Sequence, residues 1–421
     1  MNTTRSLRLC ALLCVLTMVT IGCATTTPPS AAVELVWATG KFSADGSARE
    51  IVALWNEQHP DGPRVRVEAL LGGADEQRQL LAVEMNAGLS TFDVLDLDVI
   101  WTGEFAEQGW LLDLDDLRPE IEAVTLPTPL STAVWNDTLW AAPYTTEAGL
   151  LYYRADLIST PPTSWSELAK IGKRIAAQQG IAPLVADGKQ YEGLTVQYLE
   201  YLWGAGGKLL STDNRSVALE QDPAQQAAEF MRTAYQNSIY APGFDTMDLE
   251  DAQDTFQSGG AVFMRSWPYA FQKMNGPDPD PFSDVVGKVG IAPLPTFDGN
   301  GTTPALGGHN VAVSRYSDNP DDAVEFVEFV ATSPDVQRMI AQRYSLAPTL
   351  RSTYEDLADD PMMTLLARVL PHARPRPPSP EWPSLSEEIQ QQVFTAYTGK
   401  QDPAQAVNDL RSVLASTTES R

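Results

Sequence analysis

Cysteine is almost missing from this chain of 421 residues, and the few cysteines are clustered. They are Cys10, Cys14 and Cys23, so the 398 residues that follow Cys23 (421 minus 23) contain none. A body without cysteine has no disulfide framework, no cysteine-ligated metal site and no cysteine nucleophile. These three kinds of chemistry are therefore excluded beyond the N-terminal segment.

Histidine is scarce as well, with only His59, His309 and His372 in the whole sequence. None of them stands in an HExxH arrangement, and the sequence has no GxSxG, no Walker A loop and no GxGxxG after a strand. Its many aspartates leave calcium binding open, but EF-hand spacing is missing. We therefore expect a protein that is not an enzyme and that needs no metal and no cofactor.

Positive charge is low: 29 Lys and Arg face 55 Asp and Glu, which gives a formal net charge of −26. Such an acidic surface repels phosphate backbones and anionic membrane surfaces, so we expect no nucleic-acid partner. The composition otherwise indicates a folded protein, with 43% hydrophobic residues and ten tryptophans. Its length predicts about two to three domains.

Long hydrophobic runs are missing too, apart from one near the N-terminus. Leu9–Ile21 is apolar except for Thr17 and Thr20, and Arg5 and Arg8 precede it. A membrane-spanning helix needs about 20 apolar residues, so this run is too short to span and has the length of a signal-peptide core. The sequence therefore predicts an exported protein.

The end of this run resembles a bacterial lipobox. Ile21–Ala24 places small residues around Cys23, which the resemblance makes the lipidated first residue of the mature protein, although Thr20 stands where the motif prefers Leu. We predict a lipoprotein signal peptide over residues 1–22, a lipidated cysteine and tether over 23–32, and an extracytoplasmic, membrane-anchored protein. The alternative is a retained apolar segment with incidental cysteines.

The body alternates between strand-like and helix-like segments. Expected strands are Val33–Thr39, Arg64–Leu70, Phe92–Asp98, Ala261–Trp267, Val289–Pro293 and Asn310–Ser314, and expected helices are Asp45–His59, Glu76–Ala87 and Gly103–Gly109. This βαβ rhythm predicts an α/β protein with a parallel or mixed sheet and helices on both faces.

Several later helices have clear start signals. Ser164 and Glu167 form a capping-box pattern, and Asp222, Asn319, Ser333 and Asp402 each precede a proline that suits a first helical position. By contrast, the proline-rich segment Pro371–Pro383 predicts extended, irregular backbone.

Six motifs, in order along the chain, resemble extracellular sugar-binding proteins of ABC importers. They are Phe92–Leu111, Ala148–Leu157, Pro161–Trp165, Gly188–Leu194, Phe263–Tyr269 and Leu385–Ile389. The last three resemble the trehalose/maltose-binding subgroup in particular. The similarity spans roughly residues 33–410, and the order of the motifs makes the family assignment specific although each motif alone is weak.

The resemblance implies a two-lobe periplasmic-binding-protein-like α/β fold with discontinuous domains, a hinge and a ligand cleft between the lobes. It places the first lobe at 33–143 plus 288–325 and the second at 144–287 plus 326–421. It also implies a disaccharide ligand and the transmembrane subunits of an ABC permease as partners. A receptor of this kind needs no oligomer, so we expect a monomer.

Carboxylates and arginines suit the hydroxyl rim of a sugar, because carboxylates accept and guanidinium groups donate hydrogen bonds. Asp98 ends a hydrophobic strand, where α/β folds place ligands, and the resemblance makes it a sugar-binding acid. The resemblance also makes Arg78 ligand-facing and places Glu147 where the subgroup has aspartate. A capping role for Asp98 and a solvated helix position for Arg78 are the structural alternatives.

Aromatic rings suit the C–H faces of a sugar. Trp267 and Tyr269 are two residues apart, so both would point to one face of an extended segment. The resemblance makes Trp267 the stacking ring, with a core position as the alternative for both. Gly307 and Gly308 could let backbone approach the ligand closely, as in the family, or could form a plain turn.

The proline-rich segment contributes two more candidates. Arg376 matches a cleft-facing arginine of the subgroup by its distance from Leu385, with Arg374 as the alternative, and Trp382 would wall the same pocket. His309 replaces an aromatic residue of some relatives and is expected to pack rather than bind.

Some family contacts are altered or uncertain. Thr145 stands where an aromatic residue is usual, and Asp45 is the only acid near the first-loop position where some relatives have a ligand-binding glutamate. Tyr191 and Glu192 are expected to stabilise the second lobe.

Three functions follow. The first is a receptor that captures an α-linked disaccharide, trehalose before maltose, and delivers it to a permease. The second is a same-fold receptor for another cargo, such as a longer oligosaccharide or a sugar phosphate; an acidic pocket disfavours the phosphate. The third is a secreted glycosidase with Asp98 and Glu147 as paired carboxylates.

Overall fold

A computed structural model describes residues 33–211, 216–276 and 279–418. The predicted signal peptide, Cys23 and the tether lie outside the described residues. Within the described ranges, no helix is both long and apolar enough to cross a membrane. The description below concerns the compact unit that begins at Val33.

The first of two main sheets has six strands and mixed polarity. In sheet order they are β12 (Ala347–Pro348), β6 (Ala142–Ala148), β11 (Leu306–Val313), β3 (Val94–Asp98), β1 (Glu34–Gly40) and β2 (Arg64–Leu70). Strand β1 pairs in parallel with β2 and β3, whereas β11 runs antiparallel to β3 and β6. The prediction of a mixed sheet is therefore confirmed.

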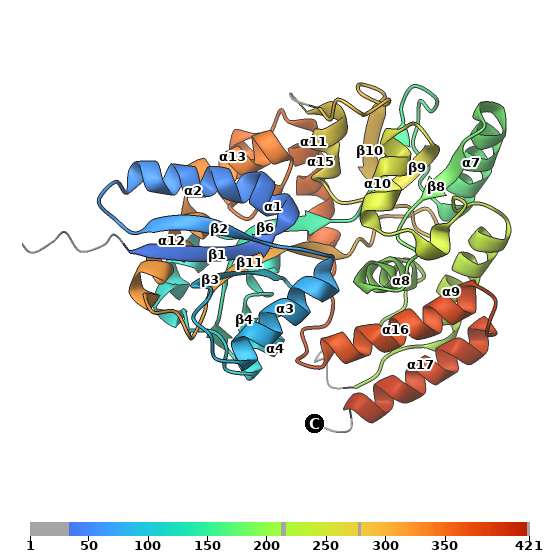
Figure 1. Cartoon of the computed structure of the whole chain (residues 1–421). Coiled ribbons are helices and arrows are strands. Elements are labelled where there is room, and N and C mark those ends of the chain that lie inside the picture. Colours follow the sequence, from blue (N-terminus) through green and yellow to red (C-terminus); the bar gives the residue numbers. More distant parts are fainter. Residues whose placement is uncertain (1–32, 212–215, 277–278, 419–421) are drawn as a thin grey trace, which may run out of the picture. The chain divides into compact units, whose positions relative to one another are not determined.

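Helices cover both faces of this sheet, as predicted. They are α1 (Lys41–Asp45), α2 (Ser47–Gln58), α3 (Ala74–Asn86), α4 (Thr102–Glu107), α5 (Arg118–Val124), α6 (Pro127–Leu130), α12 (Pro320–Thr332) and α13 (Pro334–Tyr344). Figure 1 shows α2 above the sheet and α3 and α4 below it. The rings of Trp37, Trp55 and Phe326 meet edge to face between β1, α2 and α12, and all three are fully buried.

Short elements complete this side of the molecule. They are a 3₁₀ turn (Asp115–Leu117), the hairpin β4 (Val134–Trp135) and β5 (Thr138–Leu139), and α14 (Arg351–Asp356).

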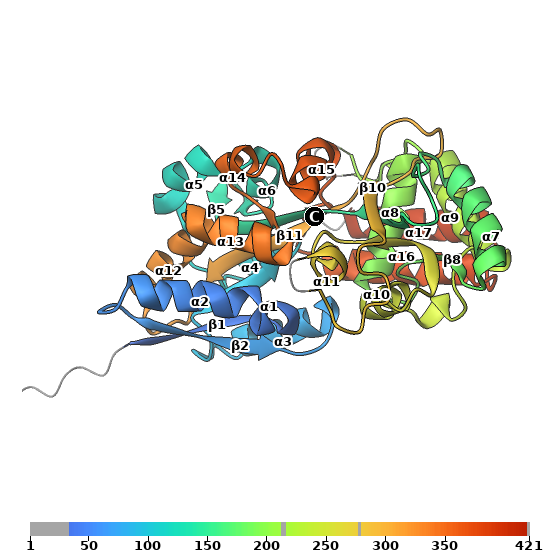
Figure 2. The ribbon, with the colours of Figure 1, turned by 90° about the horizontal axis from the view of Figure 1, so that it is seen from above.

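The second sheet has four strands. In sheet order they are β10 (Val289–Pro293), β7 (Leu150–Arg154), β9 (Ala261–Ser266) and β8 (Ala182–Val185). Its surrounding helices are α7 (Trp165–Gln179), α8 (Glu192–Gly204), α9 (Gln221–Gln236), α10 (Leu249–Gln257), α11 (Ala270–Asn275), α16 (Trp382–Tyr397) and α17 (Pro403–Thr418), with a 3₁₀ turn at Phe244–Thr246. Helix α15 (Pro361–Val369), which a 3₁₀ turn at Leu370–His372 follows, contacts both β10 of this sheet and β6 of the first. Figure 2 shows the two sheets side by side, each with its own helices.

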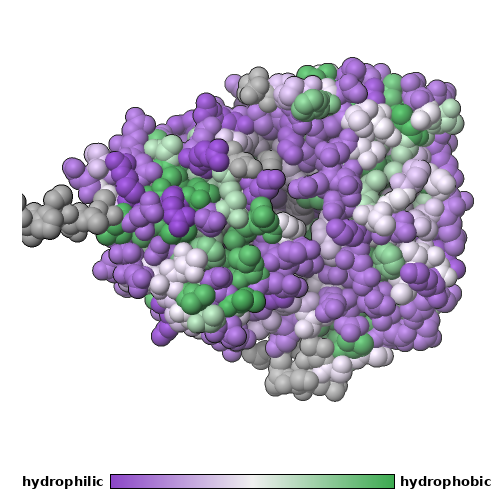
Figure 3. Space-filling view, viewed as in Figure 1, coloured by the Kyte–Doolittle hydropathy of each residue, from purple (hydrophilic) through white to green (hydrophobic). Residues whose placement is uncertain are grey.

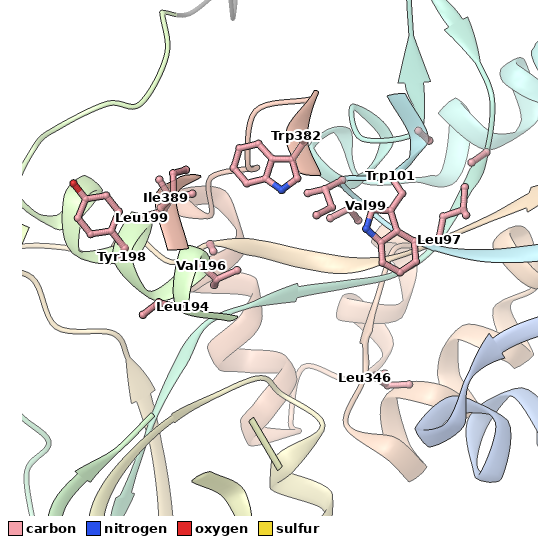
Figure 4. Close-up of a cluster of buried hydrophobic side chains, with 14 of the residues drawn as sticks. Leu97, Val99, Trp101, Leu194, Val196, Tyr198, Leu199, Leu346, Trp382 and Ile389 are labelled. Atoms are coloured by element: carbon pink, nitrogen blue, oxygen red, sulfur yellow. The ribbon is translucent and has the colours of Figure 1, made fainter. Parts of the chain in front are cut away.

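Helix α8 is buried on nearly all sides, polar residues such as Glu200 included, and is therefore a core helix. It contacts α9 and α16, which separate it from α17 (Figure 1). Its side chains Leu194 and Leu199 are fully buried, and Figure 4 shows Trp382, from the start of α16, between this cluster and Val99 and Trp101 of the first-sheet side. A hydrophobic layer thus continues from one sheet's surroundings to the other's.

The chain passes between the two sheets at three places, and these crossings lie against one another. The first is Gly149, between β6 and β7, whose amide donates to the carbonyl of Ala305 on the second crossing. The amide of Leu306 in turn donates to the carbonyl of Arg374, which lies on the third. Residues 373–380 form no helix or strand, as the prolines predict. The predicted irregular segment Pro371–Pro383 was too long at both ends, because Pro371 lies in a 3₁₀ turn and α16 begins at Trp382.

Parts of two predicted lobe segments lie with the other sheet. Residues 288–325 were expected in the first lobe, but β10 pairs with β7 in the second sheet. Residues 326–421 were expected in the second lobe, but α12 contacts β6 and β11, and α13 contacts α2 and β12. The reason is that the chain crosses near 305 and near 374, not at 288 and 326. The remaining lobe boundaries stay a prediction.

The helix-start signals were mostly reliable. Ser164 accepts a hydrogen bond from the amide of Glu167, and Ser333 accepts one from Val336. Asn319 and Asp402 stand directly before α12 and α17. The prediction at Asp222 was wrong, because α9 begins at Gln221, one residue before it.

Candidate functional site

Polar residues gather where the ends of three neighbouring strands of the first sheet, β3, β11 and β6, meet. We call this place the polar edge. Asp98, the last residue of β3, pairs with His309 of β11, and His309 pairs with Thr145 of β6. Two residues further along the same strands, Gly307 pairs with Glu147. Since side chains alternate along a strand, these positions share one face of the sheet.

A bulge shapes this edge. Asn310 pairs with Pro143 but His309 pairs with Thr145, so Tyr144 is an extra residue in β6. The Tyr144 hydroxyl donates to Oδ2 of Asp96 at 3.1 Å. The extra residue thus adds a hydrogen bond to the carboxylate of Asp96, which lies two residues before Asp98 in β3.

Asp96 is a buried carboxylate with several partners. It accepts hydrogen bonds from the hydroxyls of Thr39 and Tyr144, and its Oδ1 lies 2.9 Å from Nδ1 of His309. Burial lowers the pKa of His309, but the charge and hydrogen bond of Asp96, together with the charges of Asp98 and Glu147, outweigh it and raise this pKa to about 9. His309 is therefore a cation at neutral pH and packs against Asp96, as the packing interpretation predicts.

Glu147 is 8% exposed and lies beside this cation. Burial raises the pKa of Glu147 to about 7, and the nearby Asp98 adds to the rise, while His309 and Arg265 oppose it. Among the described residues, none donates a hydrogen bond to its carboxylate. A buried acid of this kind can accept hydrogen bonds from a ligand's hydroxyl groups.

Arg376 connects the sheet edge with helix α8. Its Nη2 lies 2.9 Å from Oδ1 of Asp98, and its Nη1 lies 2.8 Å from Oε1 of Glu192. The same Glu192 carboxylate accepts from Nε1 of Trp382 at 3.1 Å and from the Ser386 hydroxyl. Among the two arginines considered, Arg376 is the buried one and Arg374 is exposed.

Trp267 approaches this edge from the second sheet. It follows β9, and an added Cβ on Gly307 would lie 2.8 Å from its ring, so the ring covers this glycine. Gly308 has φ +115°, and a Cβ there would lie 2.4 Å from the carbonyl oxygen of Thr145. A side chain at either glycine would therefore clash, at Gly307 with the Trp267 ring and at Gly308 with the Thr145 backbone. Trp267 thus lies next to Gly307, the strand partner of Glu147.

Tyr269 does not continue an extended segment, so the prediction that it and Trp267 point to one face through strand alternation was wrong. Its backbone is helical, with φ −58° and ψ −26°, because it is the N-cap of α11. It still lies near the site, since the charge of Glu147 contributes to the raised pKa of its hydroxyl, after burial as the main cause.

Arg78 lies on α3 at the margin of this cluster. Its Nη1 is 2.8 Å from Oε1 of Glu104, and both side chains are mostly buried. On the same helix, Asp75 accepts a hydrogen bond from the amide of Glu192 at 3.3 Å. Arg78 therefore forms an ion pair with a neighbouring helix on the first-sheet side. The alternative prediction, a solvated helix position, was wrong. The side chain of Asp45 lies outside the described residues.

The surface is hollowed between the elements of the two sheets, and hydrophilic residues surround this recess (Figure 3). The sequence did not predict two residues of this site. One is Glu192, which forms an ion pair with Arg376, and the other is Arg265, whose Cζ lies 4.1 Å from the ring centre of Trp267. Glu192 was expected only to stabilise the second lobe. Arg265 had a signal, since it precedes Trp267 by two residues in a strand.

Comparison with known sequences places the chain in a family. The family model of bacterial extracellular solute-binding proteins matches residues 39–337. A probable ABC transporter-binding protein of Deinococcus radiodurans is 30% identical over an alignment of 377 positions, which covers 84% of this chain and 86% of that protein. The maltodextrin-binding protein MdxE of Bacillus subtilis is 22% identical over an alignment of 352 positions, which covers 80% of each chain.

Solved structures agree with this placement. Maltose-bound MalE3 of T. maritima has a TM-score of 0.83 and 31% identity, and the match covers 91% of this chain and 99% of that one. A solute-binding protein of Thermotoga lettingae bound with α-D-tagatose has a TM-score of 0.82 and 24% identity over 92% and 100% of the two chains, which shows the fold alone. The protein thus has the two-lobe α/β fold of periplasmic sugar-binding proteins, and it belongs to the family of bacterial extracellular solute-binding proteins.

Proposed function

We propose that this protein is the substrate-binding lipoprotein of an ABC sugar importer and captures an α-linked disaccharide between its two sheets. Trehalose is the first candidate and maltose the second, and the maltose-bound relative at 31% identity supports maltose. Asp98, Glu147, Trp267, Tyr269, Gly307, Gly308, Arg78, Arg376 and Trp382 form the proposed site.

One observation carries this proposal. The ring of Trp267, from the second sheet, covers Gly307 of the first sheet, whose strand partner is the buried acid Glu147. An aromatic face next to acceptor oxygens suits the C–H face and hydroxyl rim of a sugar. Because the two groups come from different sheets, a solute held by both would favour the closed arrangement of the lobes.

A thermal-shift screen tests the proposal. Residues 24–421 are heated with trehalose, maltose, sucrose, cellobiose, glucose and maltotriose, since a ligand of the folded state raises the unfolding midpoint by mass action. We expect a rise with trehalose or maltose and none with cellobiose. The effect should be lost in Trp267→Ala and kept in Trp135→Ala, a partly buried tryptophan of the β4–β5 hairpin. No rise with any of these sugars would contradict the proposal.

A longer oligosaccharide is the alternative cargo. A larger midpoint shift with maltotriose than with maltose at equal concentration would favour it. The glycosidase reading makes a different prediction, namely glucose released from maltose during long incubation. We expect the sugar to be recovered unchanged. Glucose release by the unmodified protein, lost in Asp98→Asn and Glu147→Gln, would support the glycosidase hypothesis instead.

The membrane anchor is proposed on the lipobox resemblance alone. Mass spectrometry of the protein from bacterial membranes should show a mature chain that begins at Cys23 and carries acyl groups. Cys23→Ser should abolish this modification, and Cys14→Ser, in the signal peptide, should not. An unmodified Cys23 in the membrane fraction would contradict the anchor. Size-exclusion chromatography of residues 24–421 should give a monomer.

A further inference from the structure

A buried ion pair lies behind the proposed stacking ring. Arg265 of β9 and Glu200 of α8 form a two-pronged contact, with Nε–Oε2 at 2.9 Å and Nη2–Oε1 at 2.6 Å. The side chains are 2% and 3% exposed, so water does not screen the pair. Asp187 adds a second carboxylate, with Oδ2 at 3.9 Å from Nη1 of Arg265.

The carboxylate of Glu200 also contacts two crossings between the sheets. Its Oε1 accepts a hydrogen bond from the amide of Ala305 at 3.1 Å. An added Cβ on Gly149 would lie 2.1 Å from the same oxygen and 2.7 Å from Nη2 of Arg265. The pair therefore packs directly on the backbone where the chain passes from one sheet to the other.

The guanidinium of Arg265 then reaches the site. Its Cζ lies 4.1 Å from the ring centre of Trp267, a distance at which a planar cation stacks on an indole. The carbonyl oxygen of Trp267 accepts from the Tyr152 hydroxyl at 2.7 Å, which fixes the backbone at the same point. The ring itself covers Gly307.

We infer that Arg265 and Glu200 are positioning residues that hold the Trp267 ring at a fixed place relative to the crossings. Neither is part of the proposed ligand set; they act through the ring. This inference rests on the proposed function, in which Trp267 stacks on the sugar. The fork of arginine matters here, because two of its nitrogens bond Glu200 while its Cζ lies over the indole ring.

Arg265→Lys is the test variant, because it keeps the charge opposite Glu200 and loses both the fork and the stacking plane. Calorimetric titration of the full chain with maltose and trehalose should show affinity lowered about tenfold, within the range of a stacked cation. Arg154→Lys on the adjacent strand β7 is the matched control, since Arg154 makes a two-pronged contact to Asp156 and is not part of the site. It should change affinity less than about twofold.

A double variant separates positioning from general damage. If Arg265 acts through the ring, Arg265→Lys should cost no more than about twofold in a Trp267→Phe background. An equal loss in both backgrounds would overturn the inference, as would unchanged affinity in the single variant. If the unmodified protein binds neither sugar, the proposed function fails instead, and fluorine NMR, which needs no ligand, still tests the positioning.

Fluorine NMR of protein labelled with 5-fluorotryptophan reports the ring without any ligand. The resonance of Trp267 is assigned by its loss in Trp267→Phe. Arg265→Lys should shift and broaden this resonance and leave that of Trp55, in the other sheet's core, unchanged. An unmoved Trp267 resonance in the folded variant would contradict the inference even if affinity fell.

Discussion

Nη2 of Arg376 lies 2.9 Å from Oδ1 of Asp98, and the same guanidinium bonds Glu192 through Nη1 at 2.8 Å. Asp98 ends a strand of the first sheet, whereas Glu192 begins helix α8 beside the second. The buried arginine therefore connects the surroundings of both sheets at the proposed ligand site. Asp98 and Arg376 are thus ordered by each other and by Glu192.

Arg376→Met should destabilise the protein by about 3–5 kcal/mol, because it leaves the buried carboxylate of Glu192 without its charge partner. Arg374→Met, two residues earlier, changes an exposed side chain whose backbone makes the crossing contacts. It should cost less than about 0.5 kcal/mol. Urea unfolding of both variants measures the difference, and equal stabilities would show that the bridge has no structural importance.

Gly308→Ala should be more destabilising than Gly109→Ala. Both glycines have positive φ, +115° and +70°, but an added methyl at Gly109 meets open space while one at Gly308 meets the backbone of Thr145. The strain alone costs about 1 kcal/mol, and we expect Gly308→Ala to cost at least about 2 kcal/mol more. Thermal unfolding compares them, and similar midpoints would contradict the close approach.

Glu147 should make stability fall as pH rises between about 4.5 and 7. Its pKa is about 7 in the folded protein and 4.5 when exposed, so the folded state binds the proton more tightly and loses this advantage as pH rises. Glu147→Gln removes the effect, which amounts to about 3 kcal/mol at most. Unfolding from pH 5 to 8 should show a shallower pH slope in the variant, and parallel slopes would refute the raised pKa.

His309 should titrate near pH 9 because of Asp96. The chain has only three histidines, so proton NMR resolves them and His309→Gln assigns the signal. Asp96→Asn removes the largest of the effects that raise this pKa, while the charges of Asp98 and Glu147 remain, so we expect the pKa of His309 to fall below about 9. An unchanged pKa in this variant would mean that Asp96 is not the cause.

The local parts of this structure could be predicted from the sequence. Ser164 and Ser333 cap the helices that follow them, and the strand predicted at Phe92–Asp98 is present as β3, which starts two residues later and ends at the predicted Asp98. These features depend on residues a few positions apart. The extended backbone predicted at Tyr269 was wrong because a strand pattern gives no sign of where a helix cap interrupts it.

The contacts of the site could not be predicted in the same way. Arg376 and Glu192 are 184 positions apart, and Arg265 and Glu200 are 65 apart. Such pairs have no local pattern, since they depend on how helix α8 packs against the crossings. The family resemblance identified Arg376 but did not predict its ion pairs with Asp98 and Glu192. The bulge at Tyr144 was likewise invisible, because one extra residue is defined only by the neighbouring strand.

Calorimetric titration of the purified protein with trehalose and maltose, alongside Asp98→Asn, tests the central claim most directly. We predict saturable, one-to-one binding of at least one of the two disaccharides, lowered at least about tenfold in Asp98→Asn because a charged acceptor of sugar hydroxyls becomes a neutral amide. No heat of binding with either sugar, or equal affinity in Asp98→Asn, would contradict a disaccharide site between the two sheets.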